Sequence, residues 1–428
     1  MKVAQICHVY LPHIGGTELH VYNLVRDLAR AGHTVEVLTT DMETALSADE
    51  INRFPAKRFN AFPVLFRNPF PVGLARYLTR HRYDLIHVHS PWLWPSIIGS
   101  LLKRTARLVV TSHGLYPTVS SRSTQIALRL SKPLAAVVFR RADAVIALSA
   151  SERERLISFF QVRPEKVHVV APTGVEPRER EPGVERGIRS RYQLDGSRVV
   201  LFTGRIIPEK HPDVLLDALP LLRQRIPAVK LLFVGPVDPR YQHVLLGRID
   251  PTLRSEVVFA GAFDPVVDRA ILHGFYAIAD AFVALGAWEG LPTRLLEAMA
   301  HRVPCVAFRA GGVTDLIQDR LEGLLLEKLD PGDLAAKLFE VLVDQDLKAS
   351  LTGNAFEKVM GEYRRPALFQ RILDIYCSVS HIPLQSVRGE PASTGLSAGF
   401  NIPAVRPELV EGERRAQDRF VEPMNGTH

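Results

Sequence analysis

Two glutamates stand close together in the sequence, on either side of an expected helix start. Glu289 and Glu297 are separated by seven residues, with Gly290 in a loop and the helical segment LLEAMA at 295–300. One carboxylate before a helix N-terminus and one in its first turns can converge on a single ligand. Helix capping and the helix dipole favour acids at the same positions, so a structural role is the alternative.

The turn between the two glutamates offers backbone donors. The N–H groups of Gly290, Leu291 and Thr293 would suit a phosphate, whereas Pro292 has no N–H group to give. A ligand that joins a nucleobase, a diphosphate and a sugar needs amides, cations and hydroxyl-binding carboxylates together. This segment supplies the amides and the carboxylates.

Two cations follow a separate strand. Arg205 and Lys210 lie five residues apart in GRIIPEK at 204–210, directly after an expected strand at 198–204. A loop at the carboxyl end of a strand can turn both cations toward a diphosphate. The planar Arg guanidinium can donate two parallel hydrogen bonds to it, and Lys acts as a point charge. Two solvated loop cations are the alternative.

A third loop, PHIGGTE at 12–18, follows the first expected strand and carries Gly15 and Gly16. In an open α/β sheet, ligands bind at the carboxyl ends of strands, where a glycine lets backbone N–H groups approach a phosphate. A tight turn is the alternative. The loop lacks the G-x-G-x-x-G pattern, which argues against a nicotinamide-dependent enzyme.

Short β-branched strands alternate with helical segments along most of the chain, and this alternation positions all three loops. In the first half, strands are expected at 2–10, 33–40, 83–90, 106–114, 142–149 and 166–174. The pattern restarts with RVVLFTG at 198–204 and VKLLFVGP at 229–236. Such alternation predicts parallel sheets with helices on both faces. The predicted fold class is α/β, with two tandem doubly wound Rossmann-like domains.

The chain is expected to divide into five segments. A charged stretch that contains Pro and Gly and is poor in apolar residues marks a linker. After about residue 380 the periodicity stops in a tail rich in Gly, Pro and Ser. The predicted segments are the N-terminal domain 1–178, the linker 179–197, the C-terminal domain 198–366, a C-terminal helix 367–380 and a disordered tail 381–428.

Length and composition exclude several classes of protein. The 428 residues are too many for one ordinary domain, and 46% hydrophobic with 23% charged residues excludes a disordered, collagenous or coiled-coil protein. Three cysteines far apart exclude a disulfide framework, so a reducing compartment fits best. The start lacks a signal-peptide pattern, and no apolar run reaches the ~20 residues that span a bilayer. We therefore expect a soluble chain or one that lies on a membrane surface.

The net charge of +7 is unevenly distributed. Between 51 and 141, fifteen Lys and Arg accompany a single acid, Asp84. Arginines there are mixed with Phe, Leu and Val, which suits an interfacial surface attracted to anionic lipid. An ordinary solvated basic face is the alternative. No known nucleic-acid-binding module is apparent, so nucleic acid is not an expected partner.

Ordered motifs in both halves resemble one family. The motifs cover roughly residues 1–378 and are HIGGTELHVYNLVRDLARAGHTVEVLTT, YDLIHVHS, VTSHG, ADAVIALSASERERL, GRIIPEK and the Glu-x7-Glu segment that ends in GG. The chain resembles a retaining nucleotide-sugar glycosyltransferase of the GT-B type, in the glycogen-synthase-like and phosphatidylinositol-mannosyltransferase-like family (glycosyltransferase family 4). The resemblance implies an N-terminal acceptor domain and a C-terminal donor domain with a cleft between them.

The resemblance also implies roles for residues that match the family's motifs. Glu289 would hydrogen-bond the hydroxyls of the donor sugar, and Glu297 the ribose. Arg205 and Lys210 would neutralise the leaving diphosphate, and His113 in TSHG would lie near the donor sugar. The implied catalytic residues are His113, Arg205, Lys210 and Glu289, and the implied donor-binding residues are Gly15, Gly16, Arg205, Lys210, Glu289, Gly290, Leu291, Thr293 and Glu297.

The chain departs from the family's pattern at four positions in or beside these motifs. His211 follows Lys210 where a glycine is usual, and Arg302 stands at the glycine of the usual pattern EAMA-x-Gly. Asp315 replaces the glutamate that is usual after GG. Arg294 is a bulky cation where an apolar residue is frequent. Arg294 and His211 stand beside the predicted diphosphate, so they bear on donor choice. None of the four removes a residue with an implied role.

The predicted function is transfer of a sugar from a UDP- or GDP-sugar to an acceptor hydroxyl with retention of anomeric configuration. The acceptor would be lipid-linked or a saccharide, in glycolipid or surface polysaccharide synthesis. No metal or other cofactor is expected, because charge stabilisation in this family falls on the departing phosphate. We expect a cytoplasmic enzyme, peripheral on the inner face of the membrane through 51–141. The alternatives are a nucleotide-sugar epimerase and a non-catalytic sugar-nucleotide-binding protein on the same fold.

Overall fold

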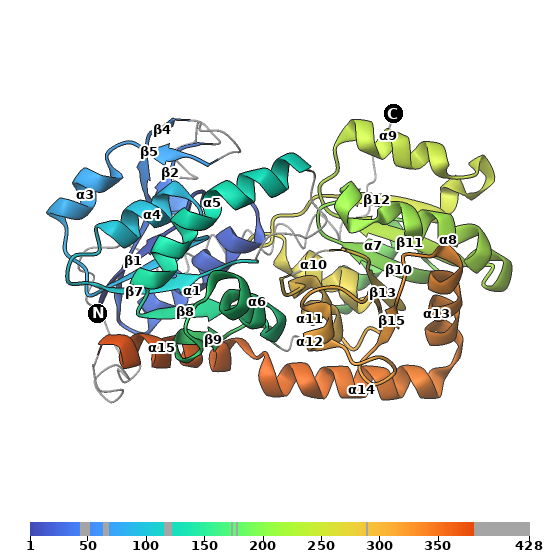
Figure 1. Cartoon of the computed structure of the whole chain (residues 1–428). Coiled ribbons are helices and arrows are strands. Elements are labelled where there is room, and N and C mark those ends of the chain that lie inside the picture. The colour runs from blue at the N-terminus through green and yellow to red at the C-terminus, as the bar shows by residue number, and fades with distance from the viewer. Residues whose placement is uncertain are drawn as a thin grey trace. The chain divides into compact units, whose positions relative to one another are not determined.

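A computed structural model gives the structure of the chain. It describes residues 1–42, 52–62, 68–114, 122–172, 174–176, 179–287 and 290–380, without the side chains of 122–131. The chain forms two compact units, which are treated separately (Figure 1). The N-terminal unit holds Met1–Thr173 together with the helix that begins at Arg365, and the C-terminal unit holds Gly174–Arg364.

The N-terminal unit is built on a parallel sheet with the strand order β3-β2-β1-β6-β7-β8-β9. Its strands are β1 (Lys2–Ile6), β2 (Thr34–Thr40), β3 (Lys57–Phe59), β6 (Leu85–His89), β7 (Arg107–Thr111), β8 (Ala144–Ala147) and β9 (Val167–Val169). From β1 the chain winds toward β3, and from β6 it winds the other way toward β9. The winding therefore reverses between β1 and β6, and in such sheets ligands bind outside the carboxyl ends of the strands at this point.

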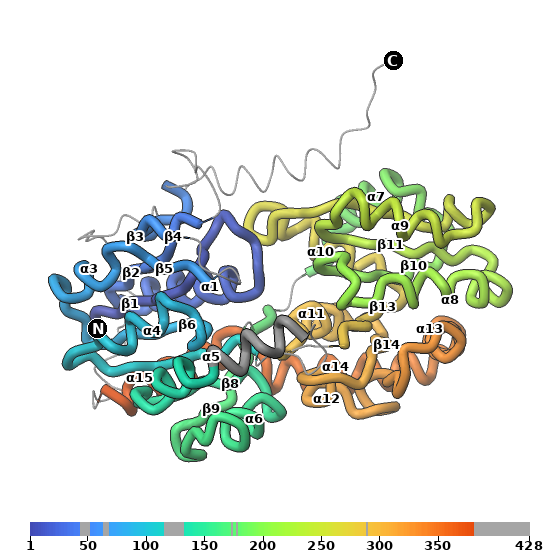
Figure 2. Tube along the Cα trace, turned by 45° about the horizontal axis from the view of Figure 1, so that its top comes forward, coloured from blue at the N-terminus to red at the C-terminus, as the bar shows by residue number. Residues whose placement is uncertain are grey.

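Helices cover the N-terminal sheet. They are α1 (Gly16–Arg30), α3 (Leu74–Arg80), α4 (Trp94–Leu101), α5 (Arg122–Arg141), α6 (Ala150–Phe160) and α15 (Arg365–Ser380). Two short antiparallel strands, β4 (Ala61–Phe62) and β5 (Phe70–Pro71), lie outside the sheet. The last helix, α15, is tied to the unit by the ion pair of Arg365 with Asp27 at 2.8 Å. It runs beside β9, where Arg371 donates to the carbonyl of Val169 (Figures 1 and 2).

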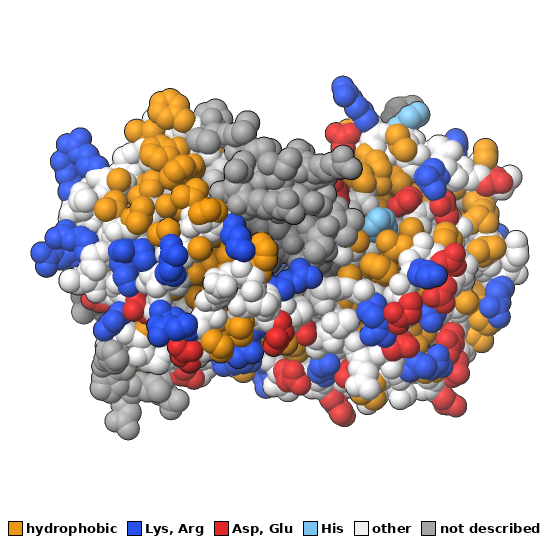
Figure 3. All heavy atoms as spheres, viewed as in Figure 1, with side chains coloured by type: hydrophobic (Ala, Val, Ile, Leu, Met, Phe, Trp, Pro, Cys, Tyr) orange, Lys and Arg blue, Asp and Glu red, His pale blue; other side chains and the backbone are white. Residues whose placement is uncertain are grey.

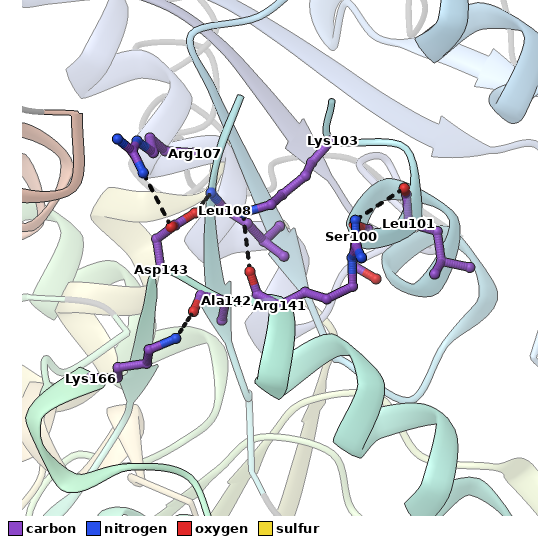
Figure 4. Close-up of polar contacts among 9 residues, drawn as sticks. All are labelled: Ser100, Leu101, Lys103, Arg107, Leu108, Arg141, Ala142, Asp143 and Lys166. Carbon is purple, nitrogen blue, oxygen red and sulfur yellow. Dashed lines mark hydrogen bonds and ion pairs between the residues drawn. The ribbon is translucent and has the colours of Figure 1, made fainter. Parts of the chain in front are cut away.

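The amino ends of β7 and β8 are joined through one carboxylate, Asp143 (Figure 4). It accepts hydrogen bonds from Lys103 Nζ and from the N–H of Leu108, each at 2.8 Å, and Arg107 lies 3.5 Å away. Burial raises the pKa of Asp143, but these hydrogen bonds and the two positive charges outweigh it and hold that pKa below its ordinary value. Arg141 donates to the carbonyl of Ser100 close by. Three cations of the basic stretch 51–141 are therefore engaged within the unit.

The C-terminal unit has a second parallel sheet, with the order β12-β11-β10-β13-β14-β15. Its strands are β10 (Arg198–Thr203), β11 (Val229–Val234), β12 (Val257–Gly261), β13 (Ala281–Ala284), β14 (Cys305–Phe308) and β15 (Leu324–Leu326). The winding reverses between β10 and β13, which pair directly at Val200 and Ala281. This pair is the switch point of the second sheet.

The helices of the C-terminal unit bury apolar faces on this sheet. They are α7 (Pro182–Arg191), α8 (Pro212–Arg225), α9 (Pro239–Arg248), α10 (Arg269–Ala277), α11 (Thr293–Ala300), α12 (Val313–Leu316), α13 (Pro331–Val343) and α14 (Gln345–Glu362). Leu215, Leu219 and Leu222 lie on one face of α8 and are each 1% exposed, which is the spacing of an amphipathic helix. That helix packs beside α13 (Figures 1 and 2).

The predicted α/β class with two doubly wound domains is confirmed, and one boundary needs correction. The predicted linker 179–197 contains α7, which belongs to the C-terminal unit. Val184 and Ile188, four residues apart, are buried, and a Cβ added at Gly274 of α10 would lie within 2.8 Å of both side chains. Two apolar residues on one face suffice to dock a short helix, although the segment is otherwise charged. The predicted tail 381–428 lies outside the described residues.

Candidate active site

Two loops leave the carboxyl ends of the paired strands β10 and β13. After β10, Gly204 has a left-handed φ of 114°, Arg205 is exposed and Lys210 ends a 3-10 turn before α8. After β13, the chain passes Gly290 and enters α11 at Thr293. Because the two strands are parallel neighbours, both loops start at the same edge of the sheet. Glu289 lies outside the described residues, as does Trp288.

A close backbone contact fixes the turn before α11. A Cβ added at Gly312 would lie 2.1 Å from the carbonyl oxygen of Gly290 and 3.0 Å from the Cα of Leu291. Leu291 is buried, and the carbonyl of Pro292 accepts the N–H of Leu295 at 3.0 Å to open the helix. Only glycine fits at position 312. The AGG segment at 310–312 therefore packs directly against the turn that carries the predicted phosphate-binding amides.

Glu297, in the first turns of α11, is held by two side chains. Its Oε2 accepts a hydrogen bond from Tyr276 on α10 at 2.7 Å and from Arg294 Nη1 at 2.9 Å. The Tyr276 hydroxyl also lies 3.0 Å from the hydroxyl of Thr203 at the end of β10. Burial, and then the negative charge of Glu297, raise the pKa of Tyr276, so it stays a neutral donor. The negative charge of Glu297 raises the pKa of Arg294.

These contacts orient the Glu297 carboxylate at the switch point. Both described hydrogen bonds go to Oε2, and neither involves Oε1. Arg294, a departure from the family's pattern, is thus an ion-pair partner of Glu297. Two further departures, His211 and Arg302, have a common explanation, because both have left-handed backbones, with φ of 49° and 55°. Glycine is the residue best suited to that conformation.

In the N-terminal unit, Gly15 and Gly16 lie at the start of α1. Gly15 is extended and its carbonyl accepts the N–H of Leu19 at 3.1 Å. A Cβ on Gly15 would meet Oε2 of the buried Glu18 at 2.2 Å, whereas a Cβ on Gly16 would meet nothing within 4 Å. The helix N-terminus is therefore open at Gly16, as an anion-binding terminus requires.

Three histidines from three elements meet at the carboxyl edge of the same sheet. His113 follows β7 with a left-handed φ of 56°, His89 ends β6 and His20 lies on α1. His89 Nδ1 lies 2.7 Å from His113 Nε2. The ring of His20 packs edge-on against both, with centroids 5.7 and 5.1 Å away. The sequence analysis selected His113; the structure adds His20 and His89.

A buried chain of hydrogen bonds continues from His89 to α15. His89 Nε2 lies 2.9 Å from Gln5 Oε1, and Gln5 Nε2 donates to the hydroxyl of Tyr376 at 3.0 Å. His87 bridges the same hydroxyl and Thr111, each at 2.7 Å. Burial is the main cause that lowers the pKa of His87 and His89, and it lowers that of His20 to about 4. The imidazoles are therefore neutral at neutral pH.

The sequence analysis missed Tyr276, His20, Gln5 and Tyr376 as contributors to these sites. Tyr276 is buried on α10, far from any of the motifs, and nothing in the sequence sets it apart from a core residue. His20 lies three residues after Thr17, in the helix that follows the glycine loop at 15–16. Its place in the first turns of that helix was the signal in the sequence that it lies near the loop. Tyr376 reaches Gln5 only because α15 folds onto the first sheet.

Two doubly wound units, with glycine-bearing loops at their switch points and a carboxylate fixed at the start of α11, define a nucleotide-sugar glycosyltransferase of the GT-B type. Residues 14–179 match the family model described as Glycosyltransferase Family 4, and residues 197–344 match the one described as Glycosyl transferases group 1. The chain belongs to glycosyltransferase family 4.

Similar proteins agree with this assignment. An uncharacterized glycosyltransferase of Methanocaldococcus jannaschii is 26% identical over 88% of this chain and 98% of its own length. The GDP-mannose-dependent alpha-(1-6)-phosphatidylinositol monomannoside mannosyltransferase of Mycobacterium tuberculosis is 25% identical over 87% of this chain and 97% of its own. Among solved structures, Anabaena HepE in complex with UDP shares the fold with a TM-score of 0.72 and 22% identity, over 88% of this chain and all of HepE.

Proposed function

We propose that the enzyme transfers a hexose from a UDP- or GDP-sugar to an acceptor hydroxyl with retention of anomeric configuration. The donor class is supported by the relative that uses GDP-mannose and by the similar structure that contains UDP. The acceptor we propose is a lipid-linked or saccharide hydroxyl in glycolipid or surface polysaccharide synthesis. Neither an epimerase nor a non-catalytic binding protein is favoured by the comparisons.

The observation that carries this proposal is the fixed carboxylate of Glu297 at the β10–β13 switch point. Its orientation by Tyr276 and Arg294 presents Oε1 for a ribose hydroxyl, as a preorganised hydrogen-bond acceptor should. The N–H groups of the turn from Gly290 to Thr293 lie at the N-terminus of α11, where the helix dipole favours a phosphate. Both features belong to one edge of one sheet.

The transfer step follows from these groups. Arg205 and Lys210 leave the neighbouring strand β10 and would stabilise the negative charge that develops on the departing diphosphate. Glu289 would hold the hydroxyls of the donor sugar, and His113 would lie beside that sugar. The departing phosphate would take the proton of the acceptor hydroxyl as the new glycosidic bond forms on the same face. In this scheme the cations stabilise the leaving group, and no metal takes part.

The test is a thermal-shift screen against UDP-, GDP- and ADP-sugars, followed by transfer assays with the donor that stabilises the chain. A bound ligand raises the melting temperature by mass action. We expect Arg205→Ala and Glu289→Gln to abolish transfer while the fold is kept, and NMR of the product to show the donor's anomeric configuration. Full activity in both variants would overturn the site. Release of an epimerised sugar without acceptor would identify an epimerase.

We also propose that the N-terminal unit lies on the inner face of an anionic membrane, in the cytoplasm. Phe62 and Phe70, which face each other across β4 and β5, are 67% and 40% exposed, and Val72 is 46% exposed. Arg76 and Arg80 on the adjacent α3 are exposed as well. Figure 3 shows hydrophobic side chains gathered over the β4–β5 region with Lys and Arg beside them. No helix in the described ranges is long and apolar enough to cross a bilayer.

Vesicle flotation tests this placement. We expect the chain to float with vesicles that contain anionic lipid and to remain in the bottom fraction with neutral vesicles. The double variant Phe62→Ser, Phe70→Ser is expected to lose flotation. Arg254→Glu, an exposed cation of the C-terminal unit, is the control. Equal flotation with both vesicle types would contradict the proposal.

A further inference from the structure

The histidine cluster of the N-terminal unit has a geometry that its hydrogen bonds do not explain. One ring nitrogen from each of His20, His89 and His113 lies within 4.8 Å of the other two. The contact between His89 and His113 satisfies those two nitrogens. His20 Nε2 is buried and has no hydrogen-bond partner among the described residues. A buried polar atom left unpaired costs about 1–3 kcal/mol, so this atom is expected to have a ligand.

The outer hydrogen bonds determine which nitrogens carry protons. His20 Nδ1 contacts the carbonyl oxygen of Pro172, and His89 Nε2 contacts Gln5 Oε1. Both partners are carbonyl oxygens that only accept, so His20 Nδ1 and His89 Nε2 are the protonated nitrogens. The lone pairs of His20 Nε2 and His89 Nδ1 are then both directed into the cluster. Metal-binding histidines have this arrangement, with the distal N–H held by a carbonyl or carboxylate.

The chemistry of the cluster suits one class of ion. Burial lowers the pKa of His20 and His113, and a metal ligand must be a neutral imidazole. Imidazole nitrogen favours zinc and similar divalent transition metals over magnesium or calcium, which take oxygen ligands. Zn–N bonds of 2.0–2.1 Å in a tetrahedron place the nitrogens about 3.3 Å apart. In the 2.7 Å contact His113 Nε2–H donates to the lone pair of His89 Nδ1. To offer Nε2 to an ion, His113 would take its other tautomer, with the proton on Nδ1, and the contact would widen slightly as His20 moves closer.

We propose that His20, His89 and His113 bind one Zn²⁺-class ion, with a fourth position left to water or another ligand. Three histidines and an open position form a known type of zinc coordination. The ion has no part in the proposed transfer. Because His113 is the residue proposed to lie beside the donor sugar, a bound ion would withdraw it, and zinc would inhibit the enzyme. This last consequence rests on the proposed function, whereas binding of the ion does not.

The test uses the full-length chain without a polyhistidine tag. Co²⁺ in a tetrahedral nitrogen site absorbs in the visible region, so titration with Co²⁺ reports both binding and geometry. We expect one ion per chain, displaced by Zn²⁺. In His20→Asn the amide keeps a donor for the carbonyl of Pro172 but removes the ligand atom, so affinity should fall by about 100-fold or more. His273→Ala is the control, because His273 and His301 form a similar close pair at 2.7 Å to which no third histidine of the described residues is added.

Two outcomes would overturn the proposal. One is the absence of visible Co²⁺ bands in the wild-type chain, which would mean that water satisfies His20 Nε2. The other is equal affinity in the wild type and His20→Asn, after circular dichroism has shown that the variant is folded. His20→Gln, which keeps an amide near the Nε2 position, serves if His20→Asn does not fold. If Zn²⁺ inhibits the wild type but not His20→Asn, inhibition of the enzyme by zinc is supported as well. The Co²⁺ titration does not depend on turnover, so it tests the ion site even if no tested donor is a substrate.

Discussion

The hydroxyl of Tyr276 lies 2.7 Å from Oε2 of Glu297, which joins the buried α10 to the first turns of α11. This contact orients the carboxylate on which the proposed donor site depends. Tyr276 is 2% exposed and also contacts Thr203 at the end of β10. Three elements that meet at the switch point of the C-terminal sheet are therefore coupled through one phenol.

Removing that phenol hydroxyl tests its positioning role. Tyr276→Phe keeps the ring in the core but leaves Glu297 with Arg294 as its described partner. We expect a loss of about 1 kcal/mol of stability and several-fold weaker nucleotide binding. Calorimetric titration with the stabilising nucleotide measures the affinity, and urea unfolding measures the stability. Tyr192→Phe in the same unit is the control, because its hydroxyl donates to the carbonyl of Ala260 at 3.4 Å and not to Glu297. Unchanged affinity in Tyr276→Phe would show that Arg294 alone suffices.

Gly312→Ala tests the backbone contact between Gly312 and the turn from Gly290 to Thr293. The added Cβ would lie 2.1 Å from the carbonyl of Gly290, so the turn must move away. We expect nucleotide affinity to fall by at least about tenfold, as misplacement by a fraction of an ångström removes aligned amide donors. Gly353→Ala in α14 has open space and is the control, with a gain of about 0.5–1 kcal/mol in unfolding free energy. Wild-type affinity in Gly312→Ala would show that the turn adapts.

We expect glycine to have different effects on stability at the two left-handed residues His211 and Arg302. A left-handed backbone costs a residue with a Cβ about 1–2 kcal/mol, part of which is offset by the greater freedom of glycine in the unfolded chain. We expect His211→Gly to gain about 0.5–1 kcal/mol in denaturant unfolding. Arg302→Gly should gain nothing, since the guanidinium lies 3.8 Å from the ring centroid of Phe356 and that contact is lost. A destabilised His211→Gly would disprove the strain argument.

The lowered pKa of Asp143 predicts that the folded chain loses stability in acid. Its pKa is held below the ordinary value in the folded chain, so the unfolded chain binds a proton more readily. The contribution of Asp143 is therefore complete above the unfolded pKa of about 3.9 and is lost as pH falls through the folded pKa. We expect Asp143→Asn to lose about 1–2 kcal/mol at pH 7 and less at pH 3, below the unfolded pKa. Urea unfolding of both chains at the two pH values measures this. Asp280→Asn, whose carboxylate pairs with Arg198 in the C-terminal unit, is a comparison.

Local patterns in the sequence were enough for the fold class. The alternation of strands and helices predicted two parallel α/β domains because hydrophobic periodicity depends on neighbouring residues alone. The same local rules located the loops with Gly15, Arg205 and Gly290 after strands, where the structure has them. They failed at 179–197, where Val184 and Ile188 form too short an apolar face to be distinguished from a linker.

The sequence by itself determined the residue types that we propose bind the donor and their order along the chain. Tertiary structure alone decided which side chains orient them. Tyr276 reaches Glu297 across 21 residues, and Tyr376 reaches Gln5 across 371, because each pair lies on elements that pack together only in the folded sheet. The histidine cluster depends likewise on the order of β1, β6 and β7, which brings carboxyl ends from distant parts of the chain to one edge. Strand order is set by long-range packing, which no local pattern records.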